Sequence, residues 1–227
     1  MQFKGFPKEG LAFLKRLKAN NSKEWFEAHR SEYEQYIVEP NRAYVMEMGE
    51  TLQILVPNIH AEPKINRSLF KIYRDSRFHL DDPIKERIGI IMWQGAGHRM
   101  QSRSFYMHYS PDEVFVATGI RNFKPPLLIT YREYIKESAK REALHYILED
   151  LKAKGYQIGE PKFKRTPRNC DPNDQYSYLY KMGAIYAYKT FTPDSTFHSE
   201  KIIDRNLQIY KDMFDLQQWV YELTLFG

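Results

Sequence analysis

The sequence contains very little cysteine and no long apolar run. Its one cysteine, Cys170, cannot form an internal disulfide, which is typical of proteins in a reducing compartment. The longest apolar run, residues 88–93, is far shorter than the ~20 residues that a membrane-spanning helix requires. The amino terminus, residues 1–7, lacks the apolar core of a secretory signal. We therefore expect a soluble, cytoplasmic protein without a membrane partner.

Motifs for metals and cofactors are also lacking. None of the seven histidines stands in an HxH or HExxH motif, and Cys170 has no CxxC partner. The one local cluster of ligating side chains, His79 with Asp81 and Asp82, is better explained as an exposed polar loop. Residues 95–99 (GAGHR) follow an expected strand, but a strand-like segment comes next, which excludes a dinucleotide-binding loop. We expect no metal and no cofactor.

The residues that are present are typical of a folded globular protein. Hydrophobic residues make up 42% of the chain and charged residues 28%, which is too apolar a composition for a disordered protein. The sequence has no internal repeat, low-complexity tract or flexible linker. We therefore predict a single domain over residues 1–227.

Helical periodicity and capping signals predict three helices in the first ~55 residues. Pro7 suits the start of the first helix, which carries a stripe of leucines. Asn21, with Glu24 three residues later, has the pattern of a capping box for the second helix. Pro40 should end the second helix, because proline breaks a helix interior, and a third helix should run to Pro57.

Short segments rich in aromatic and β-branched residues follow, separated by turns. Residues 110–113 (SPDE) favour a tight turn, because proline presets φ at the second position. Connections this short cannot form parallel crossovers, so the sheet should be antiparallel. The expected strands are residues 69–74, 87–94, 104–109 and 114–120.

Helical periodicity returns after Pro125. We predict a helical pair ended by Gly155, strands within residues 156–164 and 183–190, and a long final helix over residues 199–225. The apolar face of this final helix is broader than one stripe. The expected fold class is α+β, with a central antiparallel sheet flanked by amino-terminal helices, a mid-chain helical pair and a long carboxy-terminal helix.

Basic residues cluster around the first expected strand. Strand alternation would place Arg74 on the face of Phe70 and Ile72, toward the core, with a carboxylate or a bound anion beside it. A buried guanidinium requires such a partner, so a structural salt-bridge network and a ligand site are both consistent with the pattern. Asp75 would orient an arginine or accept a proton. The candidate ligand-binding residues are Arg67, Lys71, Arg74, Asp75, Arg77 and Lys85.

Three segments carry a resemblance to a known family. They are residues 18–26 (KANNSKEWF), 70–78 (FKIYRDSRF) and 164–168 (KRTPR). On these segments, nearly the whole chain resembles the domain of unknown function 2461 family of uncharacterised, mostly bacterial proteins. An Asp-Lys-x-Pro-Tyr-Lys segment of that family reads DDPIK here, in residues 81–85, and lacks the first lysine and the tyrosine. The resemblance implies family membership and supplies no activity.

The net charge of +5 is unevenly distributed along the chain. Residues 62–105 hold nine Lys and Arg against five Asp and Glu, and residues 160–170 hold four against one. This favours an anionic partner, and we predict a site for a small phosphate- or carboxylate-bearing ligand. Two alternatives stay open: nucleic-acid binding through these basic segments, with tyrosines as a stacking surface, and an interaction protein that uses residues 199–225. The sequence determines neither a reaction nor an oligomeric state.

Overall fold

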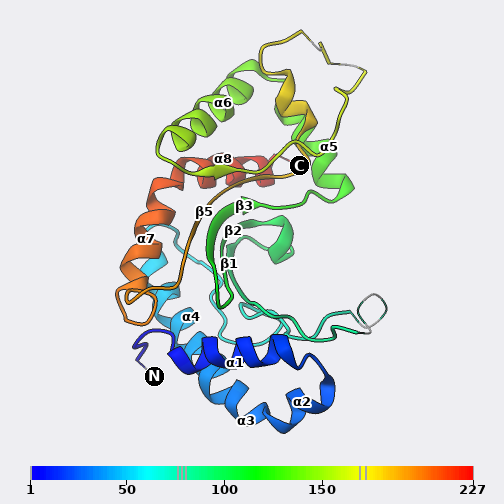
Figure 1. Cartoon of the computed structure of the whole chain (residues 1–227). Coiled ribbons are helices and arrows are strands. Elements are labelled where there is room, and N and C mark those ends of the chain that lie inside the picture. Colours follow the sequence, from blue (N-terminus) through cyan, green and yellow to red (C-terminus); the bar gives the residue numbers. More distant parts are fainter. Residues whose placement is uncertain are drawn as a thin grey trace. The chain divides into compact units, whose positions relative to one another are not determined.

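The structure is a computed structural model that describes residues 2–75, 77, 79, 81–168, 170–171 and 173–226 (Figure 1). The chain forms two compact units. Unit 1 comprises Met1–Met92, Tyr106–Val116 and Thr190–Gln208, and unit 2 comprises Trp93–Phe105, Ala117–Lys189 and Ile209–Gly227. The single domain over residues 1–227 stays a prediction.

A five-stranded antiparallel sheet has the strand order β1-β2-β3-β5-β4. The SPDE turn between β2 and β3 closes as predicted, with the Ser110 N–H donating to the Glu113 carbonyl at 2.8 Å. Gly119 has φ +110°, and a Cβ there would lie 2.2 Å from the Ile185 carbonyl oxygen, so only glycine permits this approach to β5. The predicted α+β class is confirmed. The strands are β1 (Ile88–Gln94), β2 (Arg103–Tyr109), β3 (Val114–Ile120), β4 (Gln157–Ile158) and β5 (Ile185–Phe191).

The predicted strand over residues 69–74 is wrong. Leu69 forms a single antiparallel bridge with Ile90 of β1, and Tyr73 forms another with Ile84. The segment changes its pairing partner between these two bridges, so no continuous ladder develops. The strand predicted within residues 156–164 is present only as the short β4.

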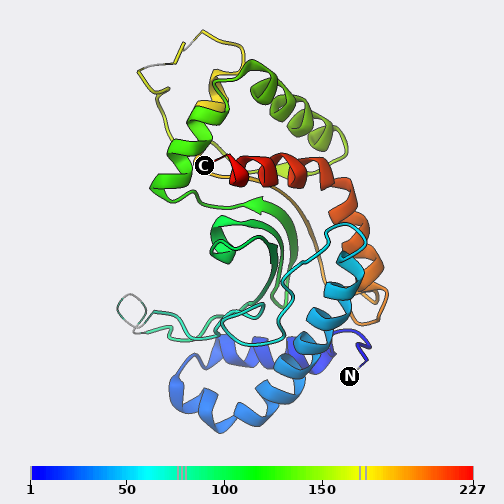
Figure 2. The same cartoon turned by 180° about the vertical axis from the view of Figure 1, so that it is seen from behind.

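Helices α1 (Lys8–Ala19), α2 (Lys23–Ala28), α3 (Arg30–Tyr33) and α4 (Glu39–Leu52) belong to unit 1 (Figure 2). The cap of α2 is Ser22, whose side chain accepts a hydrogen bond from the Trp25 N–H, and not the predicted Asn21. Pro40 does not end a helix. It lies in the first turn of α4, where a missing N–H is tolerated, after a π-helical turn at Glu34–Val38.

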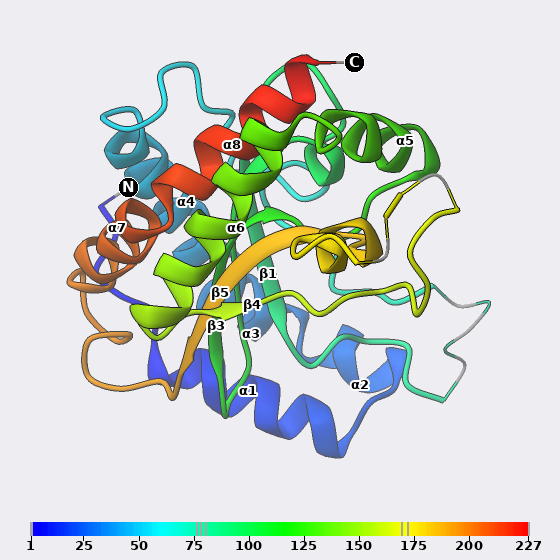
Figure 3. The same ribbon diagram turned by 90° about the horizontal axis from the view of Figure 1, so that it is seen from above.

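The mid-chain pair of helices is α5 (Pro125–Tyr134) and α6 (Ser138–Ala153), and Gly155 follows with φ +80°, as predicted. The predicted single helix over residues 199–225 is wrong, because Met213 (φ −95°, ψ 12°) separates α7 (Ile202–Asp212) from α8 (Phe214–Leu225). Helix α8 packs against α5 and α6 (Figure 3). In the described part of the chain, no helix has the length and apolar character needed to cross a membrane.

Candidate functional site

A short paired segment of unit 1 positions the candidate site. Residues 71–74 run antiparallel to the segment that leads into β1, with the Tyr73–Ile84 bridge at their centre. The Lys85 N–H donates to the Ile72 carbonyl at 2.8 Å and extends this pairing. The Cα positions on both sides are therefore fixed by backbone hydrogen bonds, although the predicted strand is absent.

Arg74 is anchored to this paired segment through one end of its guanidinium. Its Nε donates to the Ile84 carbonyl at 3.2 Å and lies 3.4 Å from Asp82 Oδ2. The side chain is 28% exposed, so it is half-buried and less covered than we predicted, but the expected carboxylate contact is present. Within the described residues, Nη1 and Nη2 of Arg74 make no hydrogen bond. The forked end of the guanidinium therefore keeps its donors.

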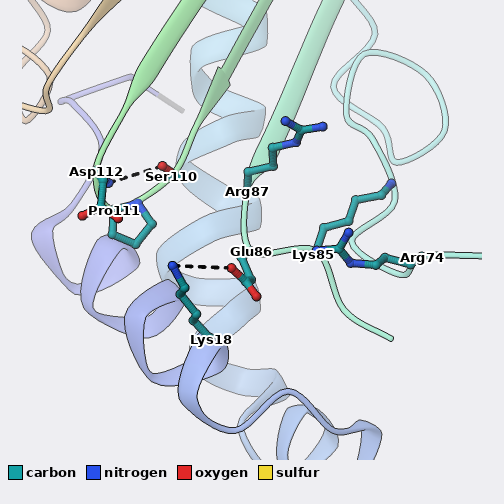
Figure 4. Close-up of a pocket in the computed structure, with 8 residues that line it drawn as sticks. All are labelled: Lys18, Arg74, Lys85, Glu86, Arg87, Ser110, Pro111 and Asp112. Atoms are coloured by element: carbon teal, nitrogen blue, oxygen red, sulfur yellow. Dashed lines mark hydrogen bonds and ion pairs between the residues drawn. The ribbon is translucent and has the colours of Figure 1, made fainter. Parts of the chain in front are cut away.

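Arg74 lines a pocket of about 400 Å³, which we call the Arg74 pocket (Figure 4). Four cations and two carboxylates line it, so the side chains sum to a formal charge of +2. In Figure 4, Arg74 and Lys85 come from one side, Lys18 rises from α1, and the turn between β2 and β3 forms the opposite side. The lining residues are Lys18, Arg74, Lys85, Glu86, Arg87, Ser110, Pro111 and Asp112.

The charges in the Arg74 pocket are only partly neutralised. Lys18 Nζ lies 4.0 Å from Glu86 Oε2, which is a loose ion pair. Lys85 Nζ donates to the Lys71 carbonyl at 2.7 Å, which holds the ammonium at the pocket. Arg87 is exposed directly before β1, and no partner for its guanidinium occurs in the described part of the chain. An excess of positive charge therefore faces the pocket.

The turn between β2 and β3 adds a neutral polar group. Ser110 Oγ accepts from the Asp112 N–H at 3.3 Å and from the Glu113 N–H at 3.1 Å. Because a hydroxyl both accepts and donates, its own proton is available to a further acceptor.

The structure places the predicted site residues in three different surroundings. Arg74 and Lys85 line the Arg74 pocket, whereas Lys71 and Asp75 line a neighbouring pocket of about 590 Å³ that Arg74 also borders. Arg77 is 77% exposed and pairs with Asp75 at 2.6 Å, which lowers the pKa of that carboxyl. Arg67 pairs with Glu62 at 3.4 Å and lines neither pocket.

Sequence reasoning missed most of the residues that line the Arg74 pocket. Lys18 belongs to the KANNSKEWF segment, which had been noted only for family resemblance and capping. Asp112 and Ser110 had been assigned to a turn without a functional role. Lys18 lies 56 residues before Arg74, and Asp112 lies 38 residues after it. Such proximity is set by tertiary pairing, which no local pattern reports.

We expected no metal at the His79 cluster and no metal or disulfide at Cys170, and the structure describes the surroundings of both. His79 Nδ1 lies 3.0 Å from Asp82 Oδ1, and among described residues no group of three His, Cys, Asp or Glu could hold a metal ion. Cys170 is half-buried, and burial raises the pKa of its thiol. Ser76 and Phe78 of the FKIYRDSRF segment, and the loop residues Asn169 and Pro172, lie outside the described residues.

Comparison with protein families identifies the lineage of the chain. Residues 9–219 match the family described as Conserved hypothetical protein (DUF2461). The chain belongs to this family. The resemblance seen in the sequence is thereby confirmed, whereas a search of curated proteins found no match. The DUF2461 description names no activity, so the function of this DUF2461 protein has to be argued from its pockets.

Proposed function

We propose that the Arg74 pocket binds a small anionic ligand that bears a phosphate or carboxylate group. The observation that supports this most is the state of the Arg74 guanidinium. It is fixed at Nε by a backbone carbonyl, while its two terminal nitrogens make no hydrogen bond within the described residues. A fork held in this way matches the paired oxygens of a carboxylate or phosphate.

The surrounding charges support an anion and not a neutral ligand. Lys18, Lys85 and Arg87 line the same pocket as Arg74, and only Glu86 and Asp112 oppose them. An exposed pocket with this excess of cations attracts anions and loses affinity as salt screens the charges. The Ser110 hydroxyl offers a further donor at the opposite side.

The dimensions of the pocket support a small ligand. A volume of about 400 Å³ lies at the low end of the range for small-molecule sites. Inorganic phosphate or a compact phosphorylated or carboxylated metabolite fits this range. The formal charge of +2 favours a dianion over a monoanion.

A thermal-shift titration with phosphate tests the proposal, with Arg74→Ala as the site variant and Arg67→Ala as the matched control. Ligand at 100 times Kd stabilises a protein by about 2.7 kcal/mol, which corresponds to a rise in Tm of about 5–10 °C. Wild type and Arg67→Ala should show this rise. Arg74→Ala should lose it, while its ligand-free Tm falls little, since a partly exposed ion pair contributes about 0–1 kcal/mol.

A large fall in the ligand-free Tm of Arg74→Ala, with no phosphate effect on wild type, would identify a structural network instead. Single-stranded oligonucleotides in the same assay test the nucleic-acid alternative. If Arg74→Ala and Arg67→Ala lost oligonucleotide binding equally, nucleic-acid binding by a basic surface would be favoured over a small-ligand pocket. The interaction alternative has no support from α7 and α8, because the apolar residues that broadened the predicted face are buried within this chain: Met213, Leu216, Trp219 and Val220.

A further inference from the structure

Unit 2 contains a buried arginine that the ligand-site prediction did not include. Arg103, at the start of β2, is only 2% exposed. Its Nη1 donates to Gln94 Oε1 at 3.0 Å and to Gln218 Oε1 at 3.2 Å. Its Nε and Nη2 are buried and make no hydrogen bond to the residues that the structure describes.

The charge of Arg103 is not neutralised by the protein. Its guanidinium lies 5.3 Å from the ring centres of both Phe214 and Tyr221, which gives partial cation–π stabilisation. No described carboxylate forms an ion pair with it, and burial lowers the pKa of Arg103 to about 10. Arg103 is therefore still protonated at neutral pH, in surroundings where an unpaired cation is costly.

A pocket of about 630 Å³ lies against the residues that hold Arg103. Gln94 and Tyr221 contact Arg103 and also line this pocket. The Arg103 guanidinium therefore lies directly behind these two side chains and does not itself line the pocket. Because the Gln94 carbonyl oxygen accepts from Arg103, the amide NH₂ of Gln94 is the group turned away from the guanidinium. The GAGHR segment, which is no dinucleotide loop, forms part of the rim, with Gly95 at φ +102°.

We propose that this pocket, the Gly95 pocket, binds a carboxylate that carries an apolar body. The unpaired Arg103 charge and Lys124, which lines the pocket, would face the carboxylate head. The apolar body would lie along Leu127 and Leu223. All these residues belong to unit 2, so the site is separate from the Arg74 pocket and does not depend on the proposed function.

The chemistry of the wall favours a carboxylate over phosphate. A monoanion matches one buried guanidinium, whereas a dianion would bring a second charge beside leucine side chains, with only the solvent-exposed Lys124 to pair it. A low-dielectric wall also strengthens the attraction between the Arg103 charge and an anion that it does not touch directly. Both the charge and the apolar lining are therefore needed for binding.

Calorimetric titration with straight-chain carboxylates tests the proposal, with octanoate as the main probe and 1-octanol as its uncharged counterpart. Octanoate should bind wild type saturably and octanol should bind at least tenfold more weakly. From butyrate to octanoate, Kd should fall by up to about fourfold for each added methylene. Equal binding of octanoate and octanol would overturn the proposal.

Arg103→Met separates a ligand role from a structural one. Replacing a buried unpaired charge by an apolar side chain should leave the ligand-free Tm unchanged or higher, while octanoate affinity falls at least tenfold. Unchanged octanoate affinity in a folded Arg103→Met protein would refute the assignment.

A second pair of variants keeps the test decisive if Arg103→Met does not fold. Leu127→Trp fills the Gly95 pocket and leaves Arg103 in place, whereas Ile129→Trp alters a 65% exposed position of α5 outside the pocket. Octanoate binding should be lost only in Leu127→Trp. Equal affinities in the two variants would exclude the pocket as the binding site.

Discussion

The Asn21 side chain pairs with both backbone polar groups of Ile84. Asn21 Nδ2 donates to the Ile84 carbonyl at 2.9 Å, and the Ile84 N–H donates to Asn21 Oδ1 at 3.0 Å. The same carbonyl accepts from Arg74 Nε. One amide between α1 and α2 therefore holds the backbone that positions the central residue of the proposed anion site.

Asn21→Ala should weaken both the fold and the site. It leaves the part-buried Ile84 N–H without its partner and the Ile84 carbonyl with Arg74 Nε alone, and we expect a loss of about 1–3 kcal/mol in the free energy of unfolding. Phosphate affinity should fall as well, because the Ile84 carbonyl no longer has a fixed position. Urea denaturation and a phosphate titration measure the two effects.

Asn20→Ala is the matched control for that experiment. The Asn20 side chain is exposed and, among the described residues, donates only to the Arg16 carbonyl, so its removal should change stability by less than ~0.5 kcal/mol. If Asn20→Ala and Asn21→Ala lost similar amounts of stability and phosphate affinity, the pairing of Asn21 with Ile84 would not be what stabilises the fold and the site.

Glu86→Gln should strengthen anion binding. The substitution raises the formal charge of the Arg74 pocket from +2 to +3 and releases Lys18 from its ion pair. We expect phosphate to bind about two- to fivefold more tightly at low salt, with the difference shrinking at high salt. Calorimetric titration at two salt concentrations measures this.

Glu62→Gln controls for the change in net charge. Glu62 pairs with Arg67 outside the pocket, so this variant should bind phosphate as wild type does. If Glu86→Gln bound phosphate no better than Glu62→Gln, the anion would not be held in the Arg74 pocket.

Acid should destabilise the cluster beside the paired segment. Glu27 accepts hydrogen bonds from the Arg30 side chain and from the Tyr73 hydroxyl, and these lower its pKa to about 2. Since the folded-state pKa lies below the ordinary value of 4.5, the stabilisation is complete above about pH 4.5 and is lost as pH falls toward 2. Tm measured between pH 5 and pH 2 should therefore fall less steeply in Glu27→Gln than in wild type.

Glu24→Gln, on the same helix but outside the cluster, is expected to keep the wild-type profile. If Tm fell equally steeply with pH in Glu27→Gln and in wild type, the Glu27 cluster would not contribute to the loss of stability in acid.

Much of the fold could be predicted because its signals are local. The SPDE turn, the alternating segments on either side of it and Gly155 after α6 each depend on a few adjacent residues. The wrong predictions concern features that depend on contacts between residues far apart in the sequence. Ser22 caps α2 because Asn21 is engaged by Ile84, which lies 63 residues away in sequence.

The candidate site could be predicted only in part for the same reason. Arg74 and Lys85 stand in a recognisable basic segment, but Lys18 and Asp112 reach the pocket through tertiary packing. Strand alternation predicted that Arg74 is buried, whereas the buried guanidinium in the structure is that of Arg103. Arg74 is half-buried because its segment is no regular strand, whereas Arg103 lies in β2 and is 2% exposed.

The most direct measurement follows the side-chain Nε–Hε resonances of the arginines by NMR during a phosphate titration. The Arg74 resonance is identified by its disappearance in Arg74→Lys. Our account predicts that it shifts saturably with phosphate, with the same Kd as calorimetry gives, while the Arg67 resonance stays in place. Saturable phosphate binding that leaves the Arg74 resonance unmoved, or equal shifts of both resonances, would contradict the proposed site.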